Sequence, residues 1–125
     1  MVDKQVPVSA SRLLILVAAW SAFALSTSAS AHAVIVQATP AVNAAVARGD
    51  LAIRLQFNSR IDAQRSRLTL QDPDSKSIAV TSVSSEPNVL AGRARVESPG
   101  QWTLRWQVLS RDGHITRGDV RFTVR

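Results

Sequence analysis

Two histidines and one aspartate are the residues of this sequence whose spacing suggests metal chemistry. His32 follows an Ala-Ser-Ala tripeptide, whereas Asp112 and His114 are separated only by Gly113. In an extended chain, side chains two residues apart leave the same face, and a glycine between them permits a bend. A carboxylate and an imidazole that converge in this way can bind a metal ion, although Asp-Gly is also a common hairpin turn.

The residues before His32 have the layout of a secretory signal peptide. Residues 1–12 carry Lys4 and Arg12, and residues 13–25 form an apolar run broken only by a serine. Small residues then lead to Ala-Ser-Ala, which is the A-x-A pattern of a cleavage site. The apolar run is short for a membrane-spanning helix, which needs about 20 residues, so an uncleaved anchor is the weaker alternative.

We therefore expect residues 1–31 to be a cleavable signal peptide, cut after Ala31, and residues 32–125 to be the mature domain in the periplasm. His32 would then be the first residue of that domain. With two histidines among the 94 mature residues, chance would place one there in about one case in fifty.

A mature N-terminal histidine has a metal-binding nitrogen that an internal histidine lacks. Its α-amine and its ring Nδ1 can close a six-membered chelate ring on one ion. Amines titrate near 7.7–8.0 and imidazoles near 6.5, so a metal ion can displace their protons at neutral pH. Together with the His114 imidazole and the Asp112 carboxylate, the set has three nitrogens and one oxygen. This set suits Cu(II) ahead of Zn or Ni.

Soft metal ligands are missing from the mature chain. The sequence contains no cysteine, and its one methionine is Met1. Thiolate and thioether sulfurs are the ligands that select Cu(I), so any metal chemistry must use nitrogen and oxygen.

Strands are the elements expected to position these residues. Apolar and polar residues alternate in residues 51–57, 102–108 and 120–124, as in strands with one buried face. Shorter candidate strands are residues 34–38, 67–71, 78–83 and 89–96. The Ala-rich residues 41–48 could hold a helical turn instead. We expect an all-β, immunoglobulin-like fold, a small antiparallel Greek-key sandwich or barrel of about seven strands.

The charge distribution and the tryptophan positions of the mature domain argue against nucleic-acid binding. Residues 1–31 hold two of the 15 basic and one of the 9 acidic side chains, which leaves a mature domain with 13 basic and 8 acidic ones. The basic residues are scattered along the sequence. Trp102 and Trp106 lie on the apolar side of their strand, so we expect them in the core and not on a base-stacking surface. We therefore expect no nucleic-acid binding.

At these positions the sequence resembles the CopC-type family of periplasmic copper-binding and copper-resistance proteins. The resemblance covers almost the whole mature domain. It is carried by His32, Thr39-Pro40-Ala41, Leu55, Phe57, the run PGQWTLRWQVLSRDGH at residues 99–114, Gly118 and Phe122-Thr123-Val124.

The resemblance implies a β-sandwich that binds one Cu(II) ion per chain. The implied ligands are the amine and imidazole of His32, the carboxylate of Asp112 and the imidazole of His114. The resemblance also implies that these residues meet, which periodicity alone does not fix. It further implies a soluble copper carrier or buffer in copper resistance or supply, not an enzyme, which passes copper to an inner-membrane partner of the CopD type. We expect the protein to be a monomer.

Three features depart from the family pattern. Asn58 follows Phe57 where the family often has an acidic residue, so an oxygen ligand from that strand is not expected. Asn43 stands where the family usually has glycine, and asparagine accepts a left-handed backbone better than most residues. A Met-rich segment for Cu(I) is missing, which disfavours exchange between two copper sites.

Two alternatives remain open from the residues alone. An N-terminal-histidine copper monooxygenase that acts on polysaccharides would also place two histidines on a β-sandwich. The short mature domain, the lack of tyrosine and the tryptophans on an apolar strand face disfavour this enzyme. A metal-free immunoglobulin-like interaction module would need neither histidine.

Overall fold

The computed structural model describes residues 32–84 and 86–125, so the predicted signal peptide at residues 1–31 lies outside the described residues. The described strands are β1 (Ile35–Thr39), β2 (Ala45–Val46), β3 (Gly49–Phe57), β4 (Ile61–Gln71), β5 (Ser77–Val80), β6 (Val89–Val96), β7 (Gly100–Ser110) and β8 (Ile115–Val124). In this part of the chain, no helix is long and apolar enough to cross a membrane.

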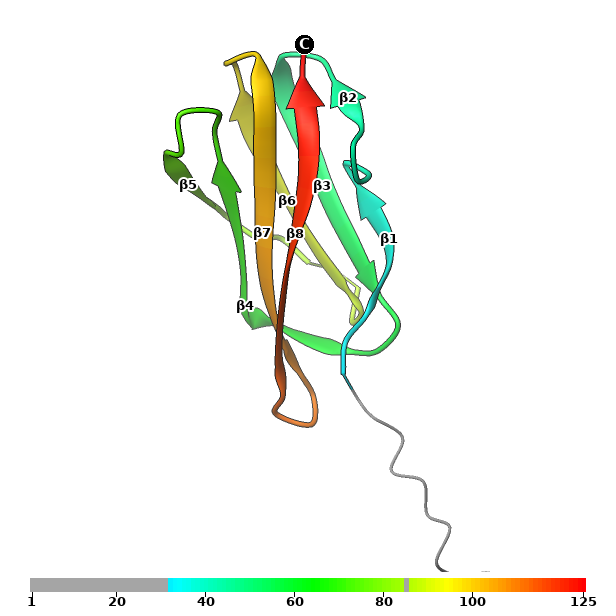
Figure 1. Cartoon of the computed structure of the whole chain (residues 1–125). Coiled ribbons are helices and arrows are strands. Elements are labelled where there is room, and N and C mark those ends of the chain that lie inside the picture. Colours follow the sequence, from blue (N-terminus) through cyan, green and yellow to red (C-terminus); the bar gives the residue numbers. More distant parts are fainter. Residues whose placement is uncertain (1–31, 85) are drawn as a thin grey trace, which may run out of the picture. The chain divides into compact units, whose positions relative to one another are not determined.

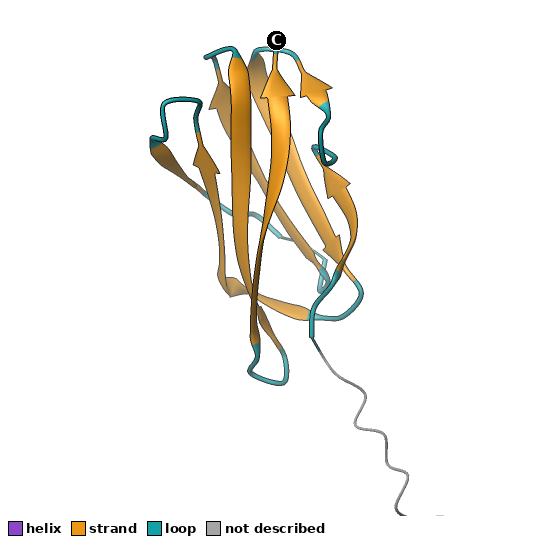
Figure 2. Cartoon of the chain, in the orientation of Figure 1, coloured by secondary structure: helices purple, strands orange, loops and turns teal. Residues whose placement is uncertain are grey.

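The strands form two sheets that face each other as a sandwich (Figures 1 and 2). One sheet has the order β1-β3-β6 and the other the order β2-β8-β7-β4-β5. All pairs of neighbouring strands are antiparallel except β2 and β8, which run parallel. The all-β sandwich predicted from the sequence is therefore confirmed.

The structure has one strand more than the sequence suggested. The additional strand is β2, which lies in the Ala-rich residues 41–48, so the helical turn considered there is wrong. Strand β2 has only two residues and lies at the edge of its sheet, so it is too short for an alternation of buried and exposed side chains to be visible in the sequence. Strand β4 begins at Ile61 and not near residue 67, because an irregular register between Asp62 and Arg67 interrupts the alternation.

The core lies between the two sheets. Its members are the inward side chains of the alternating segments, and the largest fully buried ones include Phe57, Leu55, Leu104 and Phe122. Every residue of the core cluster falls within residues 33–124.

Trp102 and Trp106 both pack inward, as the strand pattern predicted. Trp102 is fully buried, and Trp106 packs edge-to-face on Phe57 with ring centroids 5.3 Å apart. Trp106 also lies over Gly118 of the neighbouring strand, where a Cβ atom would come within 2.4 Å of the indole ring. Gly118 is thus required by the close approach of this ring.

The turn between β1 and β2 confirms the role expected for Asn43. Its φ angle is 61°, in the left-handed region that asparagine tolerates. Its backbone N–H donates to the carbonyl of Arg121 on β8 at 2.7 Å, which ties the turn to the second sheet.

Candidate metal centre

Asp112 and His114 lie in the hairpin loop that joins β7 to β8. The loop is closed at its base by the N–H of Ser110, which donates to the carbonyl of His114 at 2.8 Å. Within the loop, the N–H of Gly113 donates to the carbonyl of Ser110 at 2.9 Å. Gly113 has a φ of 89°, a conformation that glycine adopts at no steric cost. The predicted Asp-Gly turn is therefore present, and it carries both candidate ligands.

The side chains of Asp112 and His114 are in direct contact. Asp112 Oδ2 lies 2.8 Å from His114 Nδ1, and Asp112 Oδ1 accepts the backbone N–H of His114 at 3.1 Å. The side-chain hydrogen bond with His114 is the main reason that the pKa of Asp112 lies below its ordinary value. Because Nδ1 faces the carboxylate, the ring nitrogen of His114 left for a metal ion is Nε2.

The N-terminal segment is fixed immediately after His32. The side chain of Ala33 is buried in the core, whereas His32 itself is exposed. The backbone of Val34 is held at two points by Asn58, whose side-chain Oδ1 accepts the Val34 N–H at 2.9 Å. The N–H of Asn58 in turn donates to the Val34 carbonyl at 2.9 Å. His32 therefore starts from a fixed position at the end of the sandwich.

The structure brings His32 and His114 together. Their ring centroids are 5.0 Å apart, with an angle of 71° between the ring planes. In Figure 1 the start of β1 and the β7–β8 loop both lie at the lower end of the sandwich. Two imidazoles that bind one ion at a metal–nitrogen distance of about 2.0 Å have centroids about 4–6 Å apart. The observed separation therefore fits two imidazoles on one metal ion.

The described residues do not form a closed metal cage. Within residues 32–84 and 86–125, no group of three or more His, Cys, Asp or Glu side chains is arranged to hold an ion. The structure brings the two histidines together and attaches Asp112 to one of them. The donor chemistry nevertheless fits Cu(II), because imidazole and carboxylate are available without any soft sulfur ligand.

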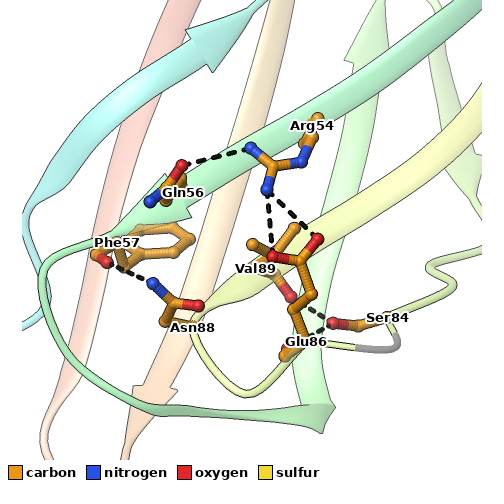
Figure 3. A network of polar contacts seen from close by, with 7 residues as sticks. All are labelled: Arg54, Gln56, Phe57, Ser84, Glu86, Asn88 and Val89. Atoms are coloured by element: carbon orange, nitrogen blue, oxygen red, sulfur yellow. Dashed lines mark hydrogen bonds and ion pairs between the residues drawn. The ribbon is translucent and has the colours of Figure 1, made fainter.

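Asn58 is a positioning residue that the sequence reading missed. The sequence showed only that it replaces an acidic residue, whereas the structure shows that its amide holds the N-terminal segment. The turn that carries Asn58 is held in its own right (Figure 3): Asn88 Nδ2 donates to the Phe57 carbonyl at 3.2 Å. Since these residues are far apart in the sequence, no local pattern signals the arrangement.

Comparison with known proteins shows the family of the chain. The family model for the CopC domain matches residues 35–125. The chain belongs to the CopC family. The curated protein YobA of Escherichia coli K12 is 30% identical over 99 residues, which cover 76% of this chain and 80% of YobA.

Solved structures of CopC-family proteins have the same fold. CopC from Methylosinus trichosporium OB3b superposes with a TM-score of 0.67 at 27% identity, over 74% of this chain and 93% of that one. PcoC from Escherichia coli, described as a methionine-rich copper resistance protein, superposes with a TM-score of 0.59 at 21% identity, over 76% of this chain and 100% of that one. This chain is not methionine-rich, since its sequence contains one methionine.

Proposed function

We propose that this protein is a periplasmic Cu(II) carrier or buffer in copper resistance or supply. Membership of the CopC family supports copper as the ion. The observation that carries the proposal for this chain is the approach of the His32 and His114 rings to 5.0 Å at one end of the sandwich. The protein binds one Cu(II) ion there and is not an enzyme.

The proposed ligands are the α-amine and Nδ1 of His32, the Nε2 atom of His114 and a carboxylate oxygen of Asp112. The amine becomes available when the precursor is cleaved after Ala31, and it supplies a donor that the side chains alone do not. Asp112 already contacts His114 through Oδ2, so it also fixes the orientation of that ring. An ion on Nε2 lies on the far side of the ring from Nδ1, so the Asp112 carboxylate has to release Nδ1 before it can supply an oxygen to that ion.

The site is at an exposed end of the domain, which suits the transfer of an ion. His114 keeps 61% of its side chain exposed, so a partner protein can reach the bound copper. We propose that the protein acts as a monomer and that the recipient is an inner-membrane protein of the CopD type. No nucleic-acid partner is proposed.

A Cu(II) competition titration of protein that begins at His32 tests the proposal. We expect one tight site per chain, and we expect His32→Ala and His114→Ala each to weaken binding by at least about 100-fold, because each removes a direct ligand. Asp112→Asn should also weaken binding, whereas the matched Asp72→Asn change, in the turn between β4 and β5, should have no effect. A His32→Ala protein with unchanged affinity would refute the proposal.

A further inference from the structure

Arginines that are scattered along the sequence gather on the outer face of the larger sheet. We call this surface, formed by the outward side chains of β4, β7 and β8, the basic face. Its charged members are Arg65, Arg67, Arg105, Arg117 and Arg121, with Asp62 and Asp119. The basic face therefore carries five positive charges and two negative charges.

Strand register explains why these side chains are neighbours. Arg67, Gln107 and Arg117 form one row across the three strands. Thr69, Arg105 and Asp119 form the next row on the same face. Strands in a sheet are about 4.8 Å apart, so the guanidinium groups of both rows can reach a common ligand. These two rows line a shallow hollow of about 570 Å³.

The positive charge of the basic face is largely unneutralised. Arg117 Nε donates to the neutral amide of Gln107 at 2.8 Å. Arg105 is 3.7 Å from Asp119, and Arg65 is 3.7 Å from Asp62; both are long ion pairs between exposed groups. Within the described part of the chain, Arg67 and Arg121 form no ion pair. Three positive charges therefore remain for an external partner.

The opposite face of the sandwich has no such excess. Arg54 makes two hydrogen bonds of 3.1 Å to the carboxylate of Glu86 (Figure 3). Arg95 pairs with Glu97 and also lies 3.4 Å from Asp50. With Arg93, this face has three basic and three acidic side chains. The charge asymmetry therefore belongs to one face and does not follow from the net charge alone.

We propose that the basic face docks on the surface of an anionic phospholipid bilayer. Guanidinium groups bind phosphate oxygens through paired hydrogen bonds, and basic residues are attracted to anionic membrane surfaces. A protein partner fits less well, because the core of a protein interface is apolar and depleted in charge. Besides Trp106 and Gly118, the hollow is lined by arginine, threonine, glutamine and aspartate side chains, so charged and polar groups predominate among its lining residues.

Docking through this face would have a consequence for the candidate metal centre. The strands β7 and β8 supply most of the basic face, and the loop between them carries Asp112 and His114. The loop would then lie beside the membrane surface, within reach of a membrane-embedded protein. The docking proposal does not depend on copper, since it rests only on the charges and the strand register.

Co-sedimentation with lipid vesicles tests the proposal on protein comprising residues 32–125. We expect binding to phosphatidylcholine vesicles that contain about one third phosphatidylglycerol at about 0.1 M salt, and none to pure phosphatidylcholine. The triple change Arg67→Gln/Arg105→Gln/Arg117→Gln should weaken binding about 100-fold, since each arginine at an anionic surface contributes about five-fold.

A matched control removes the same charge from the other face. Arg54→Gln/Arg93→Gln/Arg95→Gln has the same net charge as the first variant and should bind within about three-fold of the unmodified protein. Equal losses in the two variants would overturn the proposal, because net charge alone would then explain binding. No binding to the anionic vesicles would also overturn it. So would retention by immobilised polyglutamate without vesicle binding, which would identify an acidic protein as the partner. Thermal unfolding of both variants confirms that they are folded.

Discussion

Asn58 should determine how firmly the first ligand of the metal centre is held. The change Asn58→Ala removes the oxygen that accepts the Val34 N–H at 2.9 Å, two residues after His32. It leaves the second contact, between the Asn58 N–H and the Val34 carbonyl, in place. The N-terminal segment would then be attached at one point in place of two.

The expected size of the effect follows from the exposure of this contact. A net hydrogen bond contributes about 0.5–1.5 kcal/mol to stability, and an exposed one falls in the lower half of this range. In Asn58→Ala, metal binding itself must supply the free energy that orders His32, and the Cu(II) affinity falls by that amount. At about 1.4 kcal/mol per tenfold, a loss of 0.5–1 kcal/mol corresponds to a Cu(II) affinity about two- to five-fold weaker.

Competition titration with Cu(II) measures the affinity, and amide hydrogen exchange at Val34 reports the lost contact separately. Asn58→Asp keeps an acceptor oxygen and should protect the Val34 amide as well as asparagine does. Gln71→Ala is a control, because it removes an amide that donates to the Ser75 carbonyl in the turn between β4 and β5 and does not contact the N-terminal segment or the turn that carries Asn58. Unchanged hydrogen exchange at the Val34 amide in Asn58→Ala would show that the Asn58 side chain does not hold the N-terminal segment. Faster exchange at the Val34 amide with unchanged Cu(II) affinity would show that the Asn58–Val34 contact does not position His32 for copper binding.

Two further predictions test the packing and the donor atoms. Gly118→Ala should destabilise the domain by about 1–3 kcal/mol in denaturant unfolding, because its Cβ would lie 2.4 Å from the Trp106 ring. In a Trp106→Leu background most of this loss of stability should disappear. Replacing glycine by alanine stabilises a protein where the alanine fits, so a stabilised Gly118→Ala protein would contradict the close packing of Trp106 on Gly118. Copper affinity should fall at least about tenfold between pH 7 and pH 5, because protons compete for the amine and imidazole nitrogens. The pKa of Asp112 is lowered, so its carboxylate stays ionised throughout this window and is lost as a charged group only at more acidic pH. An affinity independent of pH would exclude nitrogen ligands.

The buried half of the fold could be predicted because burial leaves a period-two signal. Leu55, Phe57, Leu104 and Phe122 alternate with polar residues in the sequence, and all four are buried in the structure. The same reasoning fails for β2, which is too short to have a period, and for the start of β4, where the register is irregular. The alternation of apolar and polar residues therefore predicts regular, half-buried strands, but it does not reveal short edge strands or breaks in strand register.

From the residue pattern alone the candidate metal centre was predictable only as a set of residue types, and it was the family resemblance that implied that these residues meet. The Asp-Gly-His spacing and the Ala-Ser-Ala tripeptide single out the candidate ligands, yet only the packing of β1 against β3 brings His32 to His114. The role of Asn58 and the basic face could not be foreseen for the same reason. Arg67, Arg105 and Arg117 become neighbours through strand register, which cannot be read from the sequence.

Copper binding should depend on the α-amine of His32, and a comparison of two chain lengths isolates this dependence. Cu(II) affinity is measured for a chain that begins at His32 and for a chain that begins one residue earlier, at Ala31. All side chains of the site are identical in the two proteins, but only the first can close the six-membered ring through its amine and Nδ1. We predict that the additional residue weakens binding by at least about 100-fold. Equal affinities of the two chains would show that the His32 amine is not a copper ligand.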